Sequence, residues 1–277
     1  RNPRGFQIVM RKRLDDLFKG IPILEKYHWD PKRIFSKITS DSRAVGSGDV
    51  FVACHGDRMD GHDFLGQAIY AKASVIVFEK EPEVTIPSHV TAIHVQDSRA
   101  ALAMLLNNFY DCPDQKIKLI GVTGTNGKTT TTYLLHRLLR EKNPSAYLGT
   151  LWYELPSGKV PAVNTTPGPE VLIPMFHQMH EEGVKYCVME VSSHAISQQR
   201  IHGLEYELGV FTQLTQDHLD FHHSMEAYFQ VKRNFFTGSH APRRMLLNKD
   251  CPYGRRLIEE LPRAKTFSVL GEADYYV

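Results

Sequence analysis

The chain has 277 residues, of which 42% are hydrophobic and 23% charged, and its formal net charge is +2 at neutral pH. This length is enough for about two domains with real cores, and the composition is that of an ordinary soluble protein. No apolar run approaches the roughly 18 residues that span a membrane, and so small a net charge gives no argument for a nucleic-acid partner.

Strands and helices alternate along the first part of the chain. Apolar runs and helical spacing of apolar residues give the following predicted elements: strands at 49–53, 74–78 and 91–95, and helices at 64–71 and 99–110. A linker-like stretch follows at 111–114. We therefore predict a small α/β domain over residues 1–113.

The second part of the chain has the same alternation. The predicted elements are strands at 117–120, 186–191, 208–212 and 245–247, and helices after residue 128, at 170–182 and at 224–236. This order favours a mostly parallel sheet covered on both faces, with ligands at the carboxyl ends of its strands. We predict a second domain over 114–277. It ends in what reads as another strand, so we expect the chain to be part of something longer.

The segment Gly121-Val-Thr-Gly-Thr-Asn-Gly-Lys-Thr-Thr130 lies between a predicted strand and a predicted helix whose apolar positions include Leu134 and Leu138. This context is typical of a phosphate-binding loop, in which glycines turn backbone N–H groups toward an anion and the helix N-terminus adds positive charge. We expect Lys128 to reach the outer phosphates and the Thr129 hydroxyl to ligate Mg²⁺. The strict pattern G-x-x-x-x-G-K-[ST] is not met, because Val122 replaces its first glycine.

Acidic and histidine side chains follow two of the predicted strands. Glu190 closes the strand at 186–191; alone it would be a surface acid, but beside a phosphate-binding loop it is well placed to hold Mg²⁺. The segment 214–223 contains three histidines and two aspartates. His218 and His222 have the i, i+4 spacing of a zinc pair, but no third ligand pattern accompanies them. We favour a histidine that helps to hold a second Mg²⁺.

Lys232 falls on the apolar side of the predicted helix at 224–236, in line with Met225 and Tyr228. A lysine in this position must snorkel to solvent, pair with another group or be modified. Snorkelling is the default for an isolated case. Because this helix directly follows the acid- and histidine-rich segment, a functional role is favoured here.

Two further segments, 40–49 and 164–169, are polar and rich in turn residues, and on physical grounds alone each is as well explained by a turn as by a binding role. Together, these pieces resemble the Mur ligases of peptidoglycan synthesis, most closely the MurE type, from about residue 35 onward. The motifs that carry the resemblance are T-S-D-S-R at 39–43, G-D-V-F-V-A at 48–53, the loop at 121–130, N-T-T-P at 164–167, M-E-V-S-S-H-A at 189–195 and L-T-Q-D-H-L-D-F-H at 214–222.

The resemblance implies a UDP-binding first domain, an ATP-binding central domain that is incomplete at its C-terminal end, and ATP-dependent amide formation through an acyl phosphate. In that reaction a third residue, meso-diaminopimelate or L-lysine, joins UDP-N-acetylmuramoyl-L-alanyl-D-glutamate. The implied catalytic residues are Lys128, Glu190, His218 and Lys232. The implied magnesium contacts are Thr129, Glu190, His218 and a Lys232 carbamylated by CO₂.

The implied contacts with ATP are Gly124, Thr125, Asn126, Gly127, Lys128, Thr129 and Thr130. Ser42 and Arg43 fall in the region that contacts the uridine nucleotide. The implied contacts with the muramoyl-dipeptide part are Asn164, Thr165, Thr166, Ser192, Gln198 and Arg200. His223 stands where the family usually has glycine, which we expect to alter only a turn. The family's third domain is missing, so we expect this chain alone to bind ligands without completing ligation.

The four cysteines are scattered, which suits a reducing cytoplasm. We expect small-molecule substrates, no nucleic acid, no membrane insertion and a monomer. Two alternatives stay open: another Mur ligase or a folylpolyglutamate-type ligase, and a nucleotide-binding module without chemistry. The combination of Lys128, Glu190, His218 and Lys232 argues against the last, because a pure binder has little need for two metal ions.

Overall fold

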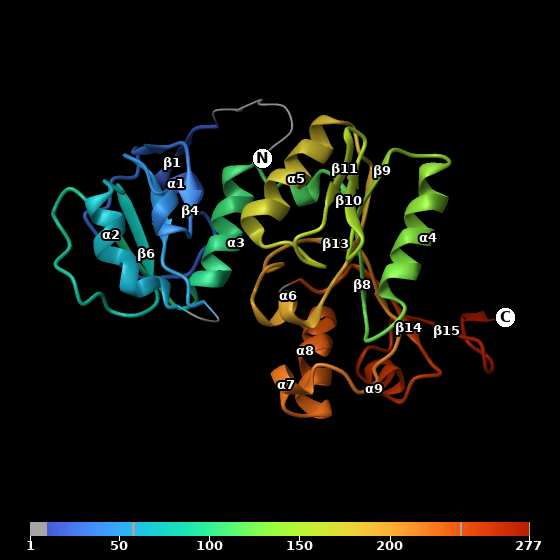
Figure 1. Ribbon diagram of the computed structural model, residues 1–277. Helices are drawn as coiled ribbons and strands as arrows, with labels where there is room; N and C mark the ends of the chain where they lie inside the picture. Colours follow the sequence, from blue (N-terminus) through green and yellow to red (C-terminus); the bar gives the residue numbers. More distant parts are fainter. Residues whose placement is uncertain (1–9, 57–58, 239, 277) are drawn as a thin grey trace. The chain divides into compact units, whose positions relative to one another are not determined.

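The computed structural model describes residues 10–56, 59–238 and 240–276 (Figure 1). The chain forms two compact units, Arg1–Cys112 and Pro113–Val277. Among the described residues, no helix combines the length and the apolarity that crossing a bilayer requires.

The first unit is built on a sheet of five strands within the described residues, in the order β2-β7-β6-β5-β4. Strands β4 to β7 are parallel, and β2 runs antiparallel beside β7. Its elements are β1 (Lys12–Arg13), α1 (Leu14–Leu17), β2 (Ile23–Tyr27), β3 (Ile34–Phe35), β4 (Ile38–Thr39), η1 (Ser42–Ala44), β5 (Val50–Val52), η2 (Gly61–Phe64), α2 (Leu65–Tyr70), β6 (Val75–Phe78), β7 (Thr91–Val95) and α3 (Ser98–Phe109). The central strands β5 and β6 are wholly buried, as expected for apolar runs in a parallel sheet covered on both faces.

The second unit is built on nine strands in the described part of the chain, in the order β11-β10-β9-β12-β8-β13-β14-β15-β16. Within the spatial run β9-β12-β8-β13-β14-β15-β16, every neighbouring pair is parallel. The β10–β11 hairpin pairs antiparallel with β9 and forms one edge of the sheet. The strands are β8 (Lys118–Thr123), β9 (Ser145–Leu148), β10 (Trp152–Leu155), β11 (Gly158–Pro161), β12 (Tyr186–Glu190), β13 (Tyr206–Phe211), β14 (Arg244–Asn248), β15 (Lys265–Ser268) and β16 (Tyr275–Tyr276).

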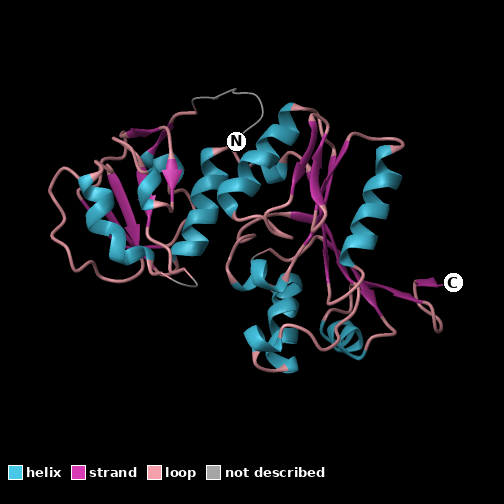
Figure 2. Cartoon of the chain, viewed as in Figure 1, coloured by secondary structure: helices cyan, strands magenta, loops and turns pink. Residues whose placement is uncertain are grey.

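Helices cover both faces of this second sheet, with α4 and α5 on opposite sides (Figure 2). The helical segments are η3 (Pro113–Gln115), α4 (Lys128–Arg140), α5 (Pro169–Glu181), α6 (Ser193–Ser197), α7 (Leu219–His222), α8 (Met225–Thr237) and α9 (Pro252–Glu260). The predicted α/β class with a mostly parallel sheet is confirmed. The hairpin β10–β11, the strands β9 and β15 and the helix α9 were not predicted from the sequence.

Helix α8 lies close against the central strand β8 because that strand carries a glycine. A Cβ at Gly121 would come within 2.6 Å of Phe235 Cζ on α8 and 2.9 Å of Tyr206 Cε1 on β13. The helix starts at Met225 because the Ser224 side chain accepts a hydrogen bond from the Ala227 N–H at 3.1 Å. Its buried stripe therefore meets the sheet next to the phosphate-binding loop.

The apolar face expected for α4 is partly wrong. Leu134 and Leu138 are 55% and 70% exposed, while Thr132 and His136 are buried. Apolar spacing predicted the helix correctly but not its buried side. That side is set by the backbone direction in which the chain leaves the loop after β8.

Candidate functional site

The loop from Gly124 to Gly127 joins β8 to α4 in a conformation that needs its glycines. Gly124 has φ +149° and Gly127 has φ +86°, both in the region that disfavours side chains. A Cβ on Gly124 would also lie 1.9 Å from Thr212 Oγ1. These are the features of a backbone cradle that lets an anion approach the helix N-terminus. The loop, Lys128 and Thr129 therefore fit the phosphates of ATP and a magnesium ion.

The loop is braced by the segment that follows β13. The Thr125 N–H donates to Gln213 O at 2.7 Å, and Thr215 N–H donates to Thr125 Oγ1 at 3.0 Å. Thr212 Oγ1 donates to Asn126 O at 2.6 Å. The segment 212–215 thus fixes the loop's shape before any ligand binds, which lowers the cost of organising it during a reaction.

Two lysines share one carbonyl oxygen of this loop. Lys128 Nζ donates to Gly124 O and Thr125 O, each at 2.9 Å, and Lys232 Nζ donates to Gly124 O at 3.0 Å. Lys232 also reaches Thr123 Oγ1 at 3.3 Å and lies over the Tyr228 ring. Its side chain is only 1% exposed, so snorkelling is wrong for this residue.

Burial lowers the pKa of both lysines. Burial, and then the neighbouring Lys128, hold the pKa of Lys232 well below its ordinary value, against the weaker effect of Asp217. Burial also lowers the pKa of Lys128, although Glu190 and Asp217 oppose the change. Lys232 is thus the amine in this site that is most strongly biased toward its neutral form.

Glu190, the last residue of β12, is completely buried beside the loop. Thr129 Oγ1 donates to its Oε2 at 3.0 Å, so the two groups predicted to contact magnesium are neighbours. Three donors from β9 and its connection to β10 also reach the carboxylate: Tyr147 OH, the Thr150 N–H and Thr150 Oγ1. Burial, followed by the Glu190 charge, raises the pKa of Tyr147, which keeps its hydroxyl proton available as a donor.

The residues predicted to contact the muramoyl-dipeptide gather around the end of β12. Thr166 Oγ1 donates to Glu190 O at 2.7 Å and accepts from the Ser192 N–H at 3.0 Å. Arg200 donates to Thr166 O at 2.8 Å and to Gln198 Oε1 at 2.6 Å.

The other two members of this group flank the same segment. Thr165 Oγ1 lies 3.1 Å from Thr150 Oγ1, and the Asn164 backbone contacts the Tyr153 hydroxyl. All six predicted residues are therefore near one edge of the sheet. Of the predicted loop residues, Thr130 lies exposed in the first turn of α4.

His218, which is predicted to contact magnesium, has Asp217, His194 and Tyr228 as its neighbours. Its Nε2 lies 3.5 Å from Asp217 Oδ2, and its ring meets the rings of His194 and Tyr228 edge-on. Within the described residues, no hydrogen bond or ion pair joins it to Glu190 or Lys232. It has φ +52° at the start of α7, and His223 at the end of α7 has φ +63°. A left-handed turn explains why glycine would suit position 223.

His222 belongs to no group of three metal-ligating side chains among the described residues. It is 5% exposed, its Nε2 lies 2.9 Å from Ser193 Oγ, and its ring stacks on Tyr228. Burial, followed by the charges of His194 and Lys232, lowers its pKa to about 4. His222 is thus held neutral inside the fold.

This histidine predicts a pH-dependent stability. Between its ordinary pKa of 6.5 and about 4, unfolding lets His222 take up a proton, so the free energy of unfolding falls as the pH is lowered through this window. The slope from one such group is at most about 1.4 kcal/mol per pH unit. His240, whose pKa is also lowered to about 4, acts in the same direction. Urea unfolding of His222→Gln between pH 7.5 and 4.5 should show a smaller slope than the unchanged protein; equal slopes would contradict this assignment.

In the first unit, Ser42 and Arg43 lie in η1, just after β4. Ser42 Oγ donates to Gln67 Oε1 at 3.1 Å, and the Arg43 guanidinium forms two hydrogen bonds with Asp41 at 2.8 and 2.9 Å. The Arg43 side chain is 83% exposed. The segment is therefore ordered by its own contacts while its charged group stays accessible.

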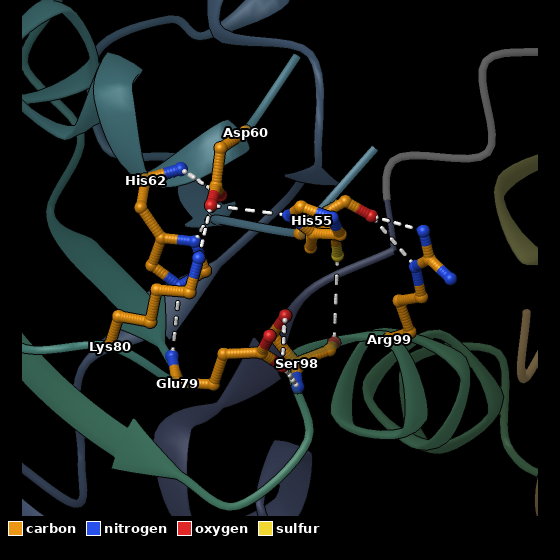
Figure 3. Close-up of polar contacts among 8 residues, drawn as sticks. His55, Asp60, His62, Glu79, Lys80, Ser98 and Arg99 are labelled. Carbon is orange, nitrogen blue, oxygen red and sulfur yellow. Dashed lines mark hydrogen bonds and ion pairs between the residues drawn. The ribbon is translucent and has the colours of Figure 1, made fainter. Parts of the chain in front are cut away.

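A polar network that was not predicted lies in the same unit (Figure 3). Asp60 accepts from Lys80 Nζ at 2.6 Å and contacts ring nitrogens of His55 and His62. Burial alone would raise the pKa of Asp60. Hydrogen bonds from Lys80 and His62 outweigh this effect and hold the pKa well below its usual range. His62 Nε2 accepts from the Glu79 N–H at 3.0 Å, which places the ring proton on Nδ1, toward Asp60.

This network and Ser42 share one edge of the first sheet. The segments concerned follow β4, β5 and β6, whose carboxyl ends point the same way because the strands are parallel. Such an edge is where open α/β sheets bind their ligands. The sequence signal that could have found it is D-G-H-D-F at 60–64, in the segment between the buried strands β5 and β6.

Residues 122–276 match the family profile described as Mur ligase middle domain, and residues 35–110 match the profile described as Mur ligase family, catalytic domain. The chain is 36% identical over 269 residues to a UDP-N-acetylmuramoyl-L-alanyl-D-glutamate–2,6-diaminopimelate ligase of Clostridium perfringens, covering 95% of this chain and 54% of that protein. The ligase of the same name from Gloeobacter violaceus is 42% identical over 239 residues, 86% of this chain and 49% of the relative.

Solved structures agree with these matches. A ligase of the same name superposes with a TM-score of 0.77 at 25% identity, covering 96% of this chain and 54% of that one. MurF from Acinetobacter baumannii shares the fold, with a TM-score of 0.64 at 19% identity over 97% of this chain and 55% of its own. The chain spans about half the length of the curated relatives it matches. Since the middle-domain profile alone covers more than half of its residues, the chain belongs to the Mur ligase family.

Proposed function

We propose that this chain forms the UDP-substrate and ATP-binding parts of a MurE-type ligase, which adds the third peptide residue to UDP-N-acetylmuramoyl-L-alanyl-D-glutamate. The observation that carries the proposal is the arrangement at Glu190. Its side chain contacts Thr129 beside the phosphate-binding loop, and its backbone contacts Thr166 in the predicted substrate segment. ATP and a peptide carboxylate could therefore meet at this residue.

In the proposed reaction, the substrate's free carboxylate attacks the γ-phosphorus of ATP, and the bond to the leaving ADP breaks to give an acyl phosphate. The amino group of the incoming amino acid then displaces phosphate and forms the amide. Lys128 neutralises phosphate charge, and the loop backbone orients the phosphates. Thr129, Glu190 and His218 would hold magnesium, which supplies further charge neutralisation when bound.

We also propose that Lys232 is carbamylated. The support is its burial and its strongly lowered pKa, which favour the neutral amine that reacts with CO₂. The Nζ lone pair forms a bond to the carbon of CO₂ and the nitrogen releases one proton, leaving a carbamate anion. That anion would help to hold a second magnesium ion, whereas an ammonium would be repelled by it.

The first unit is proposed to bind the uridine diphosphate part of the substrate at the carboxyl edge of its sheet, near Ser42 and Arg43. The incoming amino acid is proposed to be 2,6-diaminopimelate rather than L-lysine, since the relatives named above carry that amino acid in their names. We further propose that the protein acts as a monomer in the cytoplasm.

The test uses the full-length protein. Phosphate release should require ATP, Mg²⁺, UDP-N-acetylmuramoyl-L-alanyl-D-glutamate and diaminopimelate together, and the product should be the UDP-muramoyl-tripeptide. Lysine in place of diaminopimelate tests the amino-acid assignment. The UDP-muramoyl-tripeptide and a folate serve as the competing acceptors. Release that depends on either competitor instead would establish another ligase of the superfamily, and nucleotide binding without release would establish a binding module.

A further inference from the structure

Strand β9 and its connection to β10 form one wall around the Glu190 carboxylate. Tyr147 OH lies 3.2 Å from Oε1, the Thr150 N–H lies 2.9 Å from Oε1, and Thr150 Oγ1 lies 3.2 Å from Oε2. Together with Thr129, these groups give the buried carboxylate four hydrogen-bond donors. Its orientation is thus set by neutral donors from β9, from the segment between β9 and β10, and from the first turn of α4.

The backbone closes over the carboxylate because residue 149 is glycine. A Cβ on Gly149 would lie 2.3 Å from Glu190 Oε1 and 2.2 Å from Tyr147 OH. No side chain fits there without moving the carboxylate or the tyrosine. Gly149 therefore permits the next residue, Thr150, to donate through both its backbone and its side chain.

The Thr150 hydroxyl also contacts the predicted substrate segment. Its Oγ1 lies 3.1 Å from Thr165 Oγ1 as well as within reach of Glu190. A hydroxyl has one proton to donate. Because that proton is donated to Glu190 Oε2, the Thr150 hydroxyl can only accept from Thr165. The hydrogen bonds thus run in one direction, from Thr165 through Thr150 to the carboxylate.

We propose that Thr150 is a positioning residue that couples the peptide-substrate segment at 164–166 to the Glu190 carboxylate, so that substrate and Mg²⁺-nucleotide strengthen each other's binding through its hydroxyl. The inference rests on the function proposed above. A ligand that engages Thr165 changes the donor that reaches Thr150 and thereby the orientation of Glu190. By thermodynamic linkage, if the substrate tightens the binding of the Mg²⁺-nucleotide, the Mg²⁺-nucleotide tightens the binding of the substrate by the same factor.

The hydroxyl can be removed without disturbing the fold. Thr150 is exposed, and valine has nearly the shape of threonine. Thr150→Val removes the hydroxyl, whereas Thr150→Ser retains it. Thr237→Val is a matched control, because Thr237 is also exposed and its hydroxyl contacts only the Arg233 backbone among the hydrogen bonds of the described residues. All three variants should unfold at the same denaturant concentration as the unchanged protein.

The experiment measures, by calorimetry on the full-length protein, the affinity for Mg²⁺ with a non-hydrolysable ATP analogue, with and without UDP-N-acetylmuramoyl-L-alanyl-D-glutamate. We expect the substrate to tighten analogue binding by about 5-fold or more in the unchanged protein. Thr150→Val should bring this factor close to one, and Thr150→Ser and Thr237→Val should preserve it.

Three results would overturn the inference in distinguishable ways. Unaltered coupling in Thr150→Val would refute the role of Thr150 while leaving the proposed function standing. Absence of any UDP-substrate binding by the unchanged protein would refute the proposed function, and the coupling with it. A loss of coupling in Thr150→Ser equal to that in Thr150→Val would show that side-chain shape, and not the hydroxyl, is responsible.

Discussion

Replacing Lys232 with alanine in the full-length protein should reduce ligation by at least about 10²- to 10³-fold, the usual effect of removing one group that stabilises charge in a transition state. Acetate or formate should restore part of the activity. The physical reason is that the proposed carbamate supplies an anion beside magnesium, and a small carboxylate can occupy the space that the shortened side chain leaves.

The control for this experiment is Lys142→Ala, which removes an exposed lysine that lies after the end of α4. It should leave activity unchanged with and without acetate. An active Lys232→Ala enzyme would refute the carbamate proposal. An inactive variant that stays folded but gains nothing from either acid would show that Lys232 acts through its contact with Gly124 O and not through an added anion.

Lys128→Ala should abolish catalysis in the full-length protein while the fold survives. The expected loss is at least about 10²- to 10³-fold, or roughly 3 to 4 kcal/mol of transition-state stabilisation. The lysine donates to two carbonyl groups of its own loop, so we expect nucleotide to draw its ammonium toward the phosphates. Thermal unfolding without ligand checks the fold, and steady-state phosphate release measures the loss. Turnover close to that of the unchanged enzyme would mean that this loop is not the ATP site.

Local patterns were sufficient to predict the strand–loop–helix unit and the burial of Lys232. Gly124, Gly127 and Lys128 lie within five positions of one another, so the cradle follows from chain geometry alone. Lys232 falls on a stripe with Tyr228 and Phe229, and the stripe is buried as its spacing predicts. In both cases the deciding information is contained in one element.

Contacts between distant segments could not be predicted in this way. Thr150 lies 40 positions from Glu190 in the sequence and reaches it because β9 pairs with β12. The strand β9 has only four residues and follows Pro144, so its apolar pattern is too short to identify it. The predicted place of His218 beside the metal site relied on resemblance, and the left-handed turn that carries this residue has no signal in the sequence.

Gly121 has a consequence for how variants of this protein are interpreted. It is not one of the residues predicted to contact a ligand, yet the absence of its side chain sets the distance between α8 and the sheet, and hence whether Lys232 reaches the loop. In a random-mutagenesis screen scored by growth, an alanine at this position should be lost as consistently as a substitution of Lys232 itself. A map of mutational sensitivity would therefore mark the middle of β8 as part of the active site, although its contribution is a clearance of one methyl group between a strand and a helix.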